Sequence, residues 1–203
     1  MNDFFVKSKA QGSSTSDSAN VGAEAISRHI DASLKNALLG YVAFDLINPP
    51  QNFQWNEYND RPLNASHVRR LTDSFTKALQ PTRTTNSISI ALKKSWFSTE
   101  CLQDPSGKKI EEVPLLELTE QGKAAKITPF SGFHRKSALA EYTTRMKERI
   151  EQNKTRIQEL REVALATEDQ RKELAALVET DRQDEDRMVH AHLWTAAVYD
   201  LGE

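Results

Sequence analysis

Residues 141–190 contain neither glycine nor proline and consist largely of Glu, Arg, Lys, Ala and Leu. Because glycine and proline are the residues that interrupt helices most strongly, this block restricts the C-terminal part of the chain to long helices. It carries 10 Lys and Arg against 13 Asp and Glu, many of them paired at i,i+4 spacing. That pattern is typical of a solvated helix surface and not of a nucleic-acid-binding stripe. Apolar residues form one seam along the block: Met146, Ile150, Ile157, Leu160 and Ala164.

Thr167 and Gln170 mark a break within this block. A threonine followed three residues later by glutamine is the pattern of a capping box, in which the two side chains satisfy backbone N–H groups at a helix start. We therefore expect two antiparallel helices with a break near 166–168. One unbroken coiled-coil helix is the alternative.

Shorter apolar runs on either side of the block predict a small sheet. The expected strands lie at 41–47, 87–97 and 193–199, with further extended pieces at 113–118 and 125–130. A helix at 64–79, capped by Asn64 or Ser66, and a second helix from Arg135 would flank them. The expected fold class is α/β (α+β): a small mixed β-sheet with flanking helices. This domain would span 41–203, with the helical hairpin inserted at about 143–189.

The N-terminal part of the chain has a different character. Residues 1–22 are poor in apolar side chains and rich in Ser, Gly, Asn and Ala, so we expect a disordered tail. Ile26, Ile30, Leu34 and Leu38 then recur every four residues, which predicts a helix over 23–40 that ends near Gly40. This helix would dock on its own domain or, as the less favoured alternative, on a partner.

Charge and cysteine content narrow the class of protein. The formal net charge is −2, so net charge gives no support for a nucleic-acid partner. Cys101 is the only cysteine, which rules out a disulfide framework and fits a reducing compartment. We see no secretory signal and no apolar run near the ~18 residues of a membrane span. The expected location is intracellular, cytoplasmic or nuclear, without a membrane partner.

The strongest local motif is Ser131-Gly132-Phe133-His134-Arg135, which follows an extended piece and opens a helix. A helix N-terminus has unpaired N–H groups and a partial positive charge. Glycine lets the backbone approach an anion, and the arginine and histidine add donors. The motif therefore predicts a phosphate-binding turn at Gly132, His134 and Arg135. A simple helix cap is the alternative.

A second block resembles the first signature of the ParB/sulfiredoxin superfamily. It consists of Arg61-Pro62-Leu63 followed by His67-Val68-Arg69-Arg70-Leu71-Thr72-Asp73-Ser74-Phe75. In that family this block precedes a strand, a Gly-x-His-Arg or Gly-Glu-Arg-Arg turn, and a closing strand similar to Trp194–Asp200. The resemblance covers about 41–142 and 193–201, and the stretch at 143–189 is then an insertion.

The resemblance implies a set of phosphate-binding residues. In sulfiredoxins the first helix and the His-Arg pair hold nucleotide phosphates; the matching positions here are Arg61, His67, Arg70, Ser74, His134 and Arg135. The i, i+3, i+7 spacing of His67, Arg70 and Ser74 places all three on one helix face. The implied cofactor is ATP or CTP with Mg²⁺. A solvated amphipathic helix is the alternative for this face.

Departures from the family exclude some of its activities. Phe133 occupies the position of the sulfiredoxin cysteine nucleophile, so sulfinic-acid reduction by that route is excluded, and Cys101 lies far away in sequence. The glutamate of the chromosome-partitioning ParB turn and the room for a helix-turn-helix domain are both missing. Asp73 and Glu57 match the carboxylates of ParB-like serine kinases only loosely. His190 and His192, without a placed carboxylate, are poor metal ligands, and we expect them to be structural.

Three functions remain open. The first is a nucleotide- or phosphate-binding domain with NTP hydrolysis or phosphotransfer. The second is a non-catalytic interaction module that binds partner helices through residues 143–189. The third is a nucleic-acid-binding or nuclease-like module, as some members of the superfamily are.

Overall fold

The computed structural model describes residues 36–55, 62–163, 165 and 167–202. Nearly all of the described residues belong to one compact unit, Leu38–Glu203. The predicted tail at 1–22 and all but the end of the predicted helix at 23–40 lie outside the described residues. So does the predicted site residue Arg61.

A three-stranded mixed sheet forms the centre of this unit. Its strands are β1 (Leu38–Asp45), β2 (Ile88–Leu92) and β3 (Leu193–Asp200), in the order β1-β3-β2. The pairing of β1 with β3 is antiparallel and that of β2 with β3 is parallel. As the middle strand, β3 is covered on both faces, which explains its unbroken run of buried residues from Trp194 to Val198. The prediction of a small mixed sheet with flanking helices is confirmed.

Helix α2 (Ala65–Lys77) begins where the sequence predicts. The Asn64 side chain accepts a hydrogen bond from the His67 N–H at 3.0 Å and so caps the helix. Val68 and Phe75 are buried against the sheet and α4, and the Thr72 hydroxyl, with no exposed surface, donates to the Val68 carbonyl at 3.0 Å. This apolar face holds α2 against the rest of the domain.

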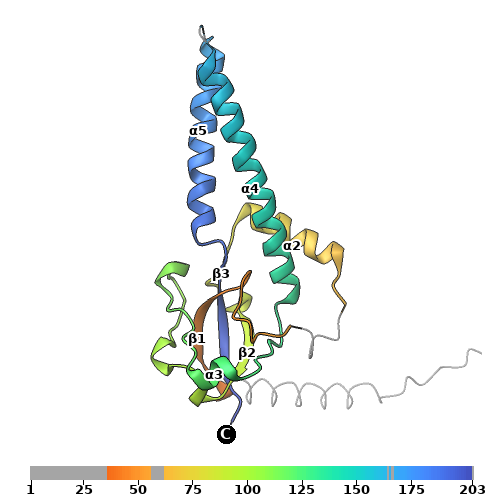
Figure 1. Ribbon diagram of the computed structural model, residues 1–203, viewed down its shortest axis with the longest axis vertical. Helices are drawn as coiled ribbons and strands as arrows, with labels where there is room; N and C mark the ends of the chain where they lie inside the picture. Colours follow the sequence, from red (N-terminus) through yellow and green to blue (C-terminus); the bar gives the residue numbers. More distant parts are fainter. Residues whose placement is uncertain (1–35, 56–61, 164, 166, 203) are drawn as a thin grey trace, which may run out of the picture. The chain divides into compact units, whose positions relative to one another are not determined.

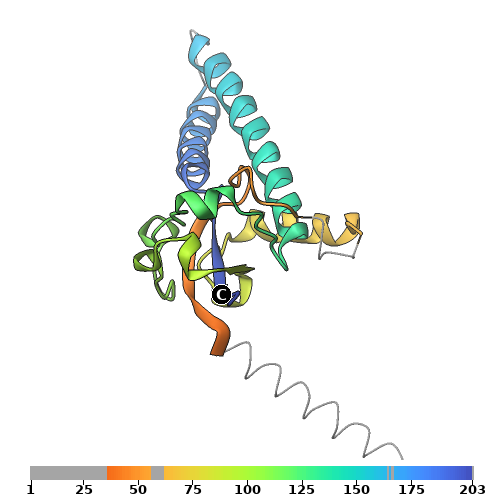
Figure 2. The same cartoon turned by 60° about the horizontal axis from the view of Figure 1, so that its bottom comes forward.

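The predicted helical pair is present as two helices, α4 (Phe133–Glu162) and α5 (Glu168–Val189). The Thr167–Gln170 capping box starts α5, as predicted, with the Thr167 N–H bonded to Gln170 Oε1 at 2.8 Å. Figure 1 shows the two helices side by side, extending away from the sheet, with α2 against the lower part of α4; Figure 2 shows the same from another angle. The α4 seam of Met146, Ile150, Ile157 and Leu160 is buried.

The base of this helical pair belongs to the main core. Tyr142 and Met146 join the same buried cluster as Trp194 and the sheet residues. The stretch that can be separated from the domain therefore starts beyond Met146, farther out than the sequence boundary near residue 143 suggests.

Several element boundaries differ from the predictions. The helix expected to reach Gly40 gives way to β1 at Leu38, which pairs with Tyr199, and Gly40 lies at an irregularity in that pairing. The pieces expected at 113–118 and 125–130 make only isolated bridges. Both contain a proline, Pro114 or Pro129, which cannot donate a ladder hydrogen bond. Short 3₁₀ turns and the small helix α3 (Glu120–Ala124) fill the region between β2 and α4.

Candidate functional site

The Gly132 turn is held firmly against β2. Gly132 is the N-cap of α4 with φ 98° and ψ −2°, a left-handed conformation that other residues adopt at a cost. A Cβ at this position would lie 2.1 Å from Ile88 Cδ1. On the strand side, the Ser89 N–H donates to Ser131 Oγ at 3.0 Å and the Phe130 N–H donates to the Ser89 carbonyl at 2.8 Å. The N-terminus of α4 therefore has a fixed place beside the sheet.

The N-termini of α2 and α4 meet at two histidines. The rings of His67 and His134 lie edge to face with their centroids 5.1 Å apart. The Asn64 N–H at the start of α2 donates to His134 Nε2 at 3.1 Å. Because a backbone N–H can only donate, His134 Nε2 is the acceptor in this contact. Sequence segments some seventy residues apart, which we predicted to form one site, are thus in contact.

This junction is strongly positive. Each helix N-terminus carries a partial positive charge from aligned peptide dipoles, and neither α2 nor α4 has an acidic residue in its first turn. The first turn of α4 instead carries three basic residues in a row, His134, Arg135 and Lys136. Basic side chains are normally found at the opposite end of a helix, so this arrangement is unfavourable without a nearby anion.

The charge of Arg135 has little compensation among the residues that the structure describes. Its side chain is half-buried, and that burial lowers the pKa of the guanidinium from its usual value. Its hydrogen bond is a long one, from Nη1 to the Ser87 carbonyl at 3.4 Å. Within the described ranges, no carboxylate forms an ion pair with it. Arg135 and Ser74 line one cavity of about 200 Å³, together with Gln80, Asn86 and Trp194.

Lys136 is a member of this group that the sequence analysis missed. Its ammonium lies 5.2 Å from the centre of the Trp55 ring, a cation–π contact, and partial burial lowers its pKa. The signal that could have found it is the run of three basic residues at the very start of a helix. Successive helical residues point about 100° apart, so these side chains surround the helix end and do not converge on one point.

The predicted site residues therefore fall into two neighbouring groups. His67, His134 and Arg70 lie at the helix junction, where Arg70 Nη2 is 3.5 Å from His67 Nδ1 and the Arg70 side chain is exposed. Ser74 and Arg135 lie at the cavity. Arg70 is not among the described residues that line that cavity.

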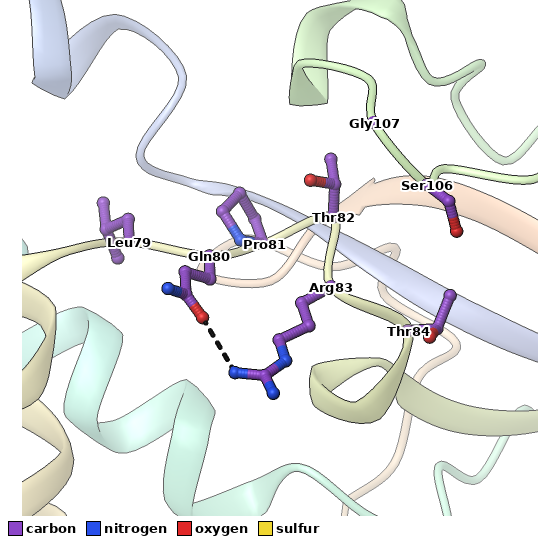
Figure 3. Close-up of a pocket in the computed structure, with 8 residues that line it drawn as sticks. All are labelled: Leu79, Gln80, Pro81, Thr82, Arg83, Thr84, Ser106 and Gly107. Carbon is purple, nitrogen blue, oxygen red and sulfur yellow. Dashed lines mark hydrogen bonds between the residues drawn. The ribbon is translucent and has the colours of Figure 1, made fainter.

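A second hollow nearby contains none of the predicted residues. It has a volume of about 570 Å³ and lies between the segment Leu79–Thr84 and the turn at Ser106 and Gly107. Figure 3 shows Arg83 directed toward Gln80, to which its Nη1 donates at 3.3 Å. Among the described residues that line the hollow, the one charged side chain, Arg83, is thus already hydrogen-bonded to a neighbour.

Other chemistry considered from the sequence has a structural explanation. Cys101 is buried, and its Sγ donates to the Ser98 carbonyl at 2.8 Å. His190 caps the C-terminus of α5, whereas His192 lines a different cavity beside Asp45, so the two imidazoles do not share a site. Within the described ranges, no three His, Cys, Asp or Glu residues are grouped so that they could hold a metal ion. None of the described helices has the length and apolarity to cross a bilayer.

The ParB/sulfiredoxin resemblance stays a prediction. It rests on the order of the elements and on the two blocks at 61–75 and 131–135. Comparison of the chain with protein-family models, with curated proteins and with solved structures found no match.

Proposed function

We propose that the chain binds a phosphate group, carried by a nucleotide such as ATP or CTP, at the N-terminus of α4. The observation that carries this proposal is the half-buried Arg135 at the positive end of a helix, without an ion-pairing carboxylate in the described part of the chain. A partly desolvated charge is costly unless a counter-charge accompanies it. A phosphate would supply that charge and accept the helix-end N–H groups as well.

The contrast with the helical pair strengthens the proposal. Along α4 and α5, several arginines are ion-paired, as in Arg149–Asp184 and Arg156–Glu173. Other arginines of the pair, such as the exposed Arg161, form no ion pair in the described part of the chain but are not half-buried as Arg135 is. Around the Gly132 turn, Arg70, Arg135 and Lys136 have no such partner within the described ranges.

The same site would take the nucleotide with Mg²⁺. Asp73, the carboxylate on α2, is engaged by Arg145 at 3.3 Å. Mg²⁺ commonly keeps several waters and binds through substrate phosphates with few protein ligands, so the ion would arrive with the nucleotide. The proposal extends to hydrolysis, which release of inorganic phosphate with the nucleoside diphosphate tests, and to phosphotransfer, which formation of the nucleoside diphosphate without an equal amount of inorganic phosphate tests.

Calorimetric titration with ATP and CTP, with and without Mg²⁺, tests the binding step. Arg135→Gln should weaken binding by about 1.5–3 kcal/mol, the range for a charge-assisted hydrogen bond, and should change the melting temperature little. Arg161→Gln, an exposed arginine in the last turn of the same helix, is the matched control and should bind like the parent. Absence of binding by the parent at millimolar nucleotide would remove the proposal. Binding of oligonucleotides that weakens steeply with salt would favour the nucleic-acid alternative.

A second candidate function concerns the helical pair. The buried residues of α5 are Asp181 and Asp184, so each apolar side chain of this helix is at least partly exposed in the described structure. Leu165 at the tip is 91% exposed and Val178 is 40% exposed. We propose, as the alternative, that residues 143–189 bind partner helices. Sedimentation of the parent and of Leu165→Lys and Val178→Lys variants tests whether a second copy of this chain is that partner. If all three sediment with the mass of a monomer at every concentration, a second copy is excluded.

A further inference from the structure

A cavity at the base of the helical pair has the features of a separate ligand site. It has a volume of about 340 Å³ and lies between the end of α2, the α4 residue Tyr142, and the end of α5. Ligand pockets in proteins commonly have volumes of roughly 300–1,000 Å³, so this cavity can enclose a small molecule. Its walls are largely apolar: Phe75, Leu79, Pro81, Ile110 and Ala191.

Two exposed cationic side chains lie beside this apolar interior. Lys77 comes from the last turn of α2 and Arg187 from the last turn of α5, and the imidazole of His190, the C-cap of α5, also lines the cavity. No carboxylate lines the cavity, and neither Lys77 nor Arg187 forms an ion pair with any residue that the structure describes. An anion bound here would meet attractive charges on two sides.

Tyr142 adds a hydrogen-bonding group to the wall of this cavity. The residue is 2% exposed and lines the cavity, and its hydroxyl makes no hydrogen bond with any described residue. The hydroxyl oxygen itself retains some contact with solvent. Burial raises the pKa of this hydroxyl, the Arg187 charge lowers it, and the charges of Asp184 and Arg149 raise and lower it respectively. The hydroxyl is therefore available to an acceptor group of a bound molecule.

We propose that this cavity binds a small organic anion with an apolar body, its anionic group held by Arg187 and the Tyr142 hydroxyl. The apolar walls would enclose an aromatic or aliphatic body, and Lys77 would add attraction at the rim. The guanidinium fork can hold two oxygens of a carboxylate or phosphonate. Neither His134 nor Arg135 lines this site, although Phe75, Lys77 and Ala78 also line the cavity beside Arg135, so the two cavities adjoin.

The probes are benzoate and phenylphosphonate, with neutral benzamide as the matched control for the ring alone. Chemical-shift perturbation in the full chain should show saturable binding of at least one anion, and benzamide should bind weakly or not at all. Tyr142→Phe, which keeps the ring, should weaken anion binding about threefold to tenfold, and Arg187→Gln by about tenfold or more. Arg182→Gln, also on α5 but engaged with Glu179 at 2.9 Å, should have no effect.

Arg135→Gln separates this site from the nucleotide site, because it should leave the affinity for benzoate unchanged. The cations could instead serve only to stabilise the two helix C-termini. In that case Arg187→Gln would lower the melting temperature and neither anion would bind the parent, which overturns the proposal. Equal binding of benzamide and benzoate, or anion binding that Tyr142→Phe and Arg187→Gln leave intact, would also overturn it.

Discussion

Substitution of Gly132 by alanine should separate two costs that the structure assigns to this turn. The first is conformational: φ is 98°, and an L-residue in this left-handed region costs about 1–2 kcal/mol. The second is steric, because the new methyl group would lie 2.1 Å from Ile88 Cδ1 and 3.1 Å from Ile88 Cγ1 and Cγ2. Ile88 has no exposed surface, so its side chain has little room to move, and overpacking of this kind costs about 1–3 kcal/mol.

Gly107 is the matched control for the conformational cost. Its φ is 76°, and nothing lies within 4 Å of an added Cβ. Gly107→Ala should therefore lower the free energy of unfolding by about 1–2 kcal/mol, and Gly132→Ala by about 2–5 kcal/mol in all. The change in unfolded-chain entropy is the same for both and cancels in the comparison. Urea denaturation of the two variants and the parent measures the difference.

A double-mutant cycle with Ile88→Val identifies the contact. Valine lacks the Cδ1 atom, and in the parent this change should cost about 0.5–1.5 kcal/mol. In the Gly132→Ala background the same change removes the clash, so it should cost less or restore stability. Equal stabilities of Gly132→Ala and Gly107→Ala, or strict additivity in the cycle, would refute the steric part of the reasoning.

The remaining predictions concern the helical pair. Thr167→Ala should lower the free energy of unfolding by about 1 kcal/mol through loss of the capping box, whereas Thr167→Ser should retain stability; thermal melts compare them. Arg149→Gln should lower the free energy of unfolding by about 1–3 kcal/mol, because Asp184 is 2% exposed and would lose the ion-pair partner that now lies 2.5 Å away. Urea denaturation measures this loss, and an unchanged free energy of unfolding would show that the ion pair does not stabilise the fold. Hydrogen bonds from Arg182 and Gln183 lower the pKa of Glu179 from 4.5 to about 2, so its contribution to helix stability is present above pH 4.5 and is lost as the pH falls toward 2. Glu179→Gln should flatten that part of a pH titration followed by helical circular dichroism; an unchanged profile would contradict the assignment.

The features that depend on local sequence could be predicted. The Thr167 capping box and the Asn64 cap each involve residues within one turn of a helix. The absence of Gly and Pro from 141–190 favours a helix at each position separately. Their consequences therefore do not depend on the rest of the fold. The same holds for the Gly132 turn at the start of α4. These elements appear where the sequence analysis expects them.

The features that depend on residues far apart in the sequence could not be predicted. The four-residue apolar period that ends with Leu38 indicates a helix, but pairing with Tyr199 at the far end of the chain makes this residue part of a strand. Helix geometry already sends Arg135 and Lys136 in different directions, but the groups that they meet, the Ser87 carbonyl and the Trp55 ring, depend on how α4 packs against distant segments. The sequence pattern gives the composition of the site, but tertiary contacts decide which side chains converge.

The length of helix α4 would amplify a small rotation at its first turn. It runs without interruption from the Gly132 turn to Glu162, and 30 residues of helix are about 45 Å long. A tilt of about 5° at the turn would therefore move the far end by roughly 4 Å, if the helix stays straight. The close contact between Gly132 and Ile88, which leaves no room for a methyl group, is the point about which the helix would tilt. A ligand that changes how the first turn of α4 packs on β2 would therefore cause a larger displacement at the far end of the helix. A single spectroscopic label at Leu165 would detect that displacement.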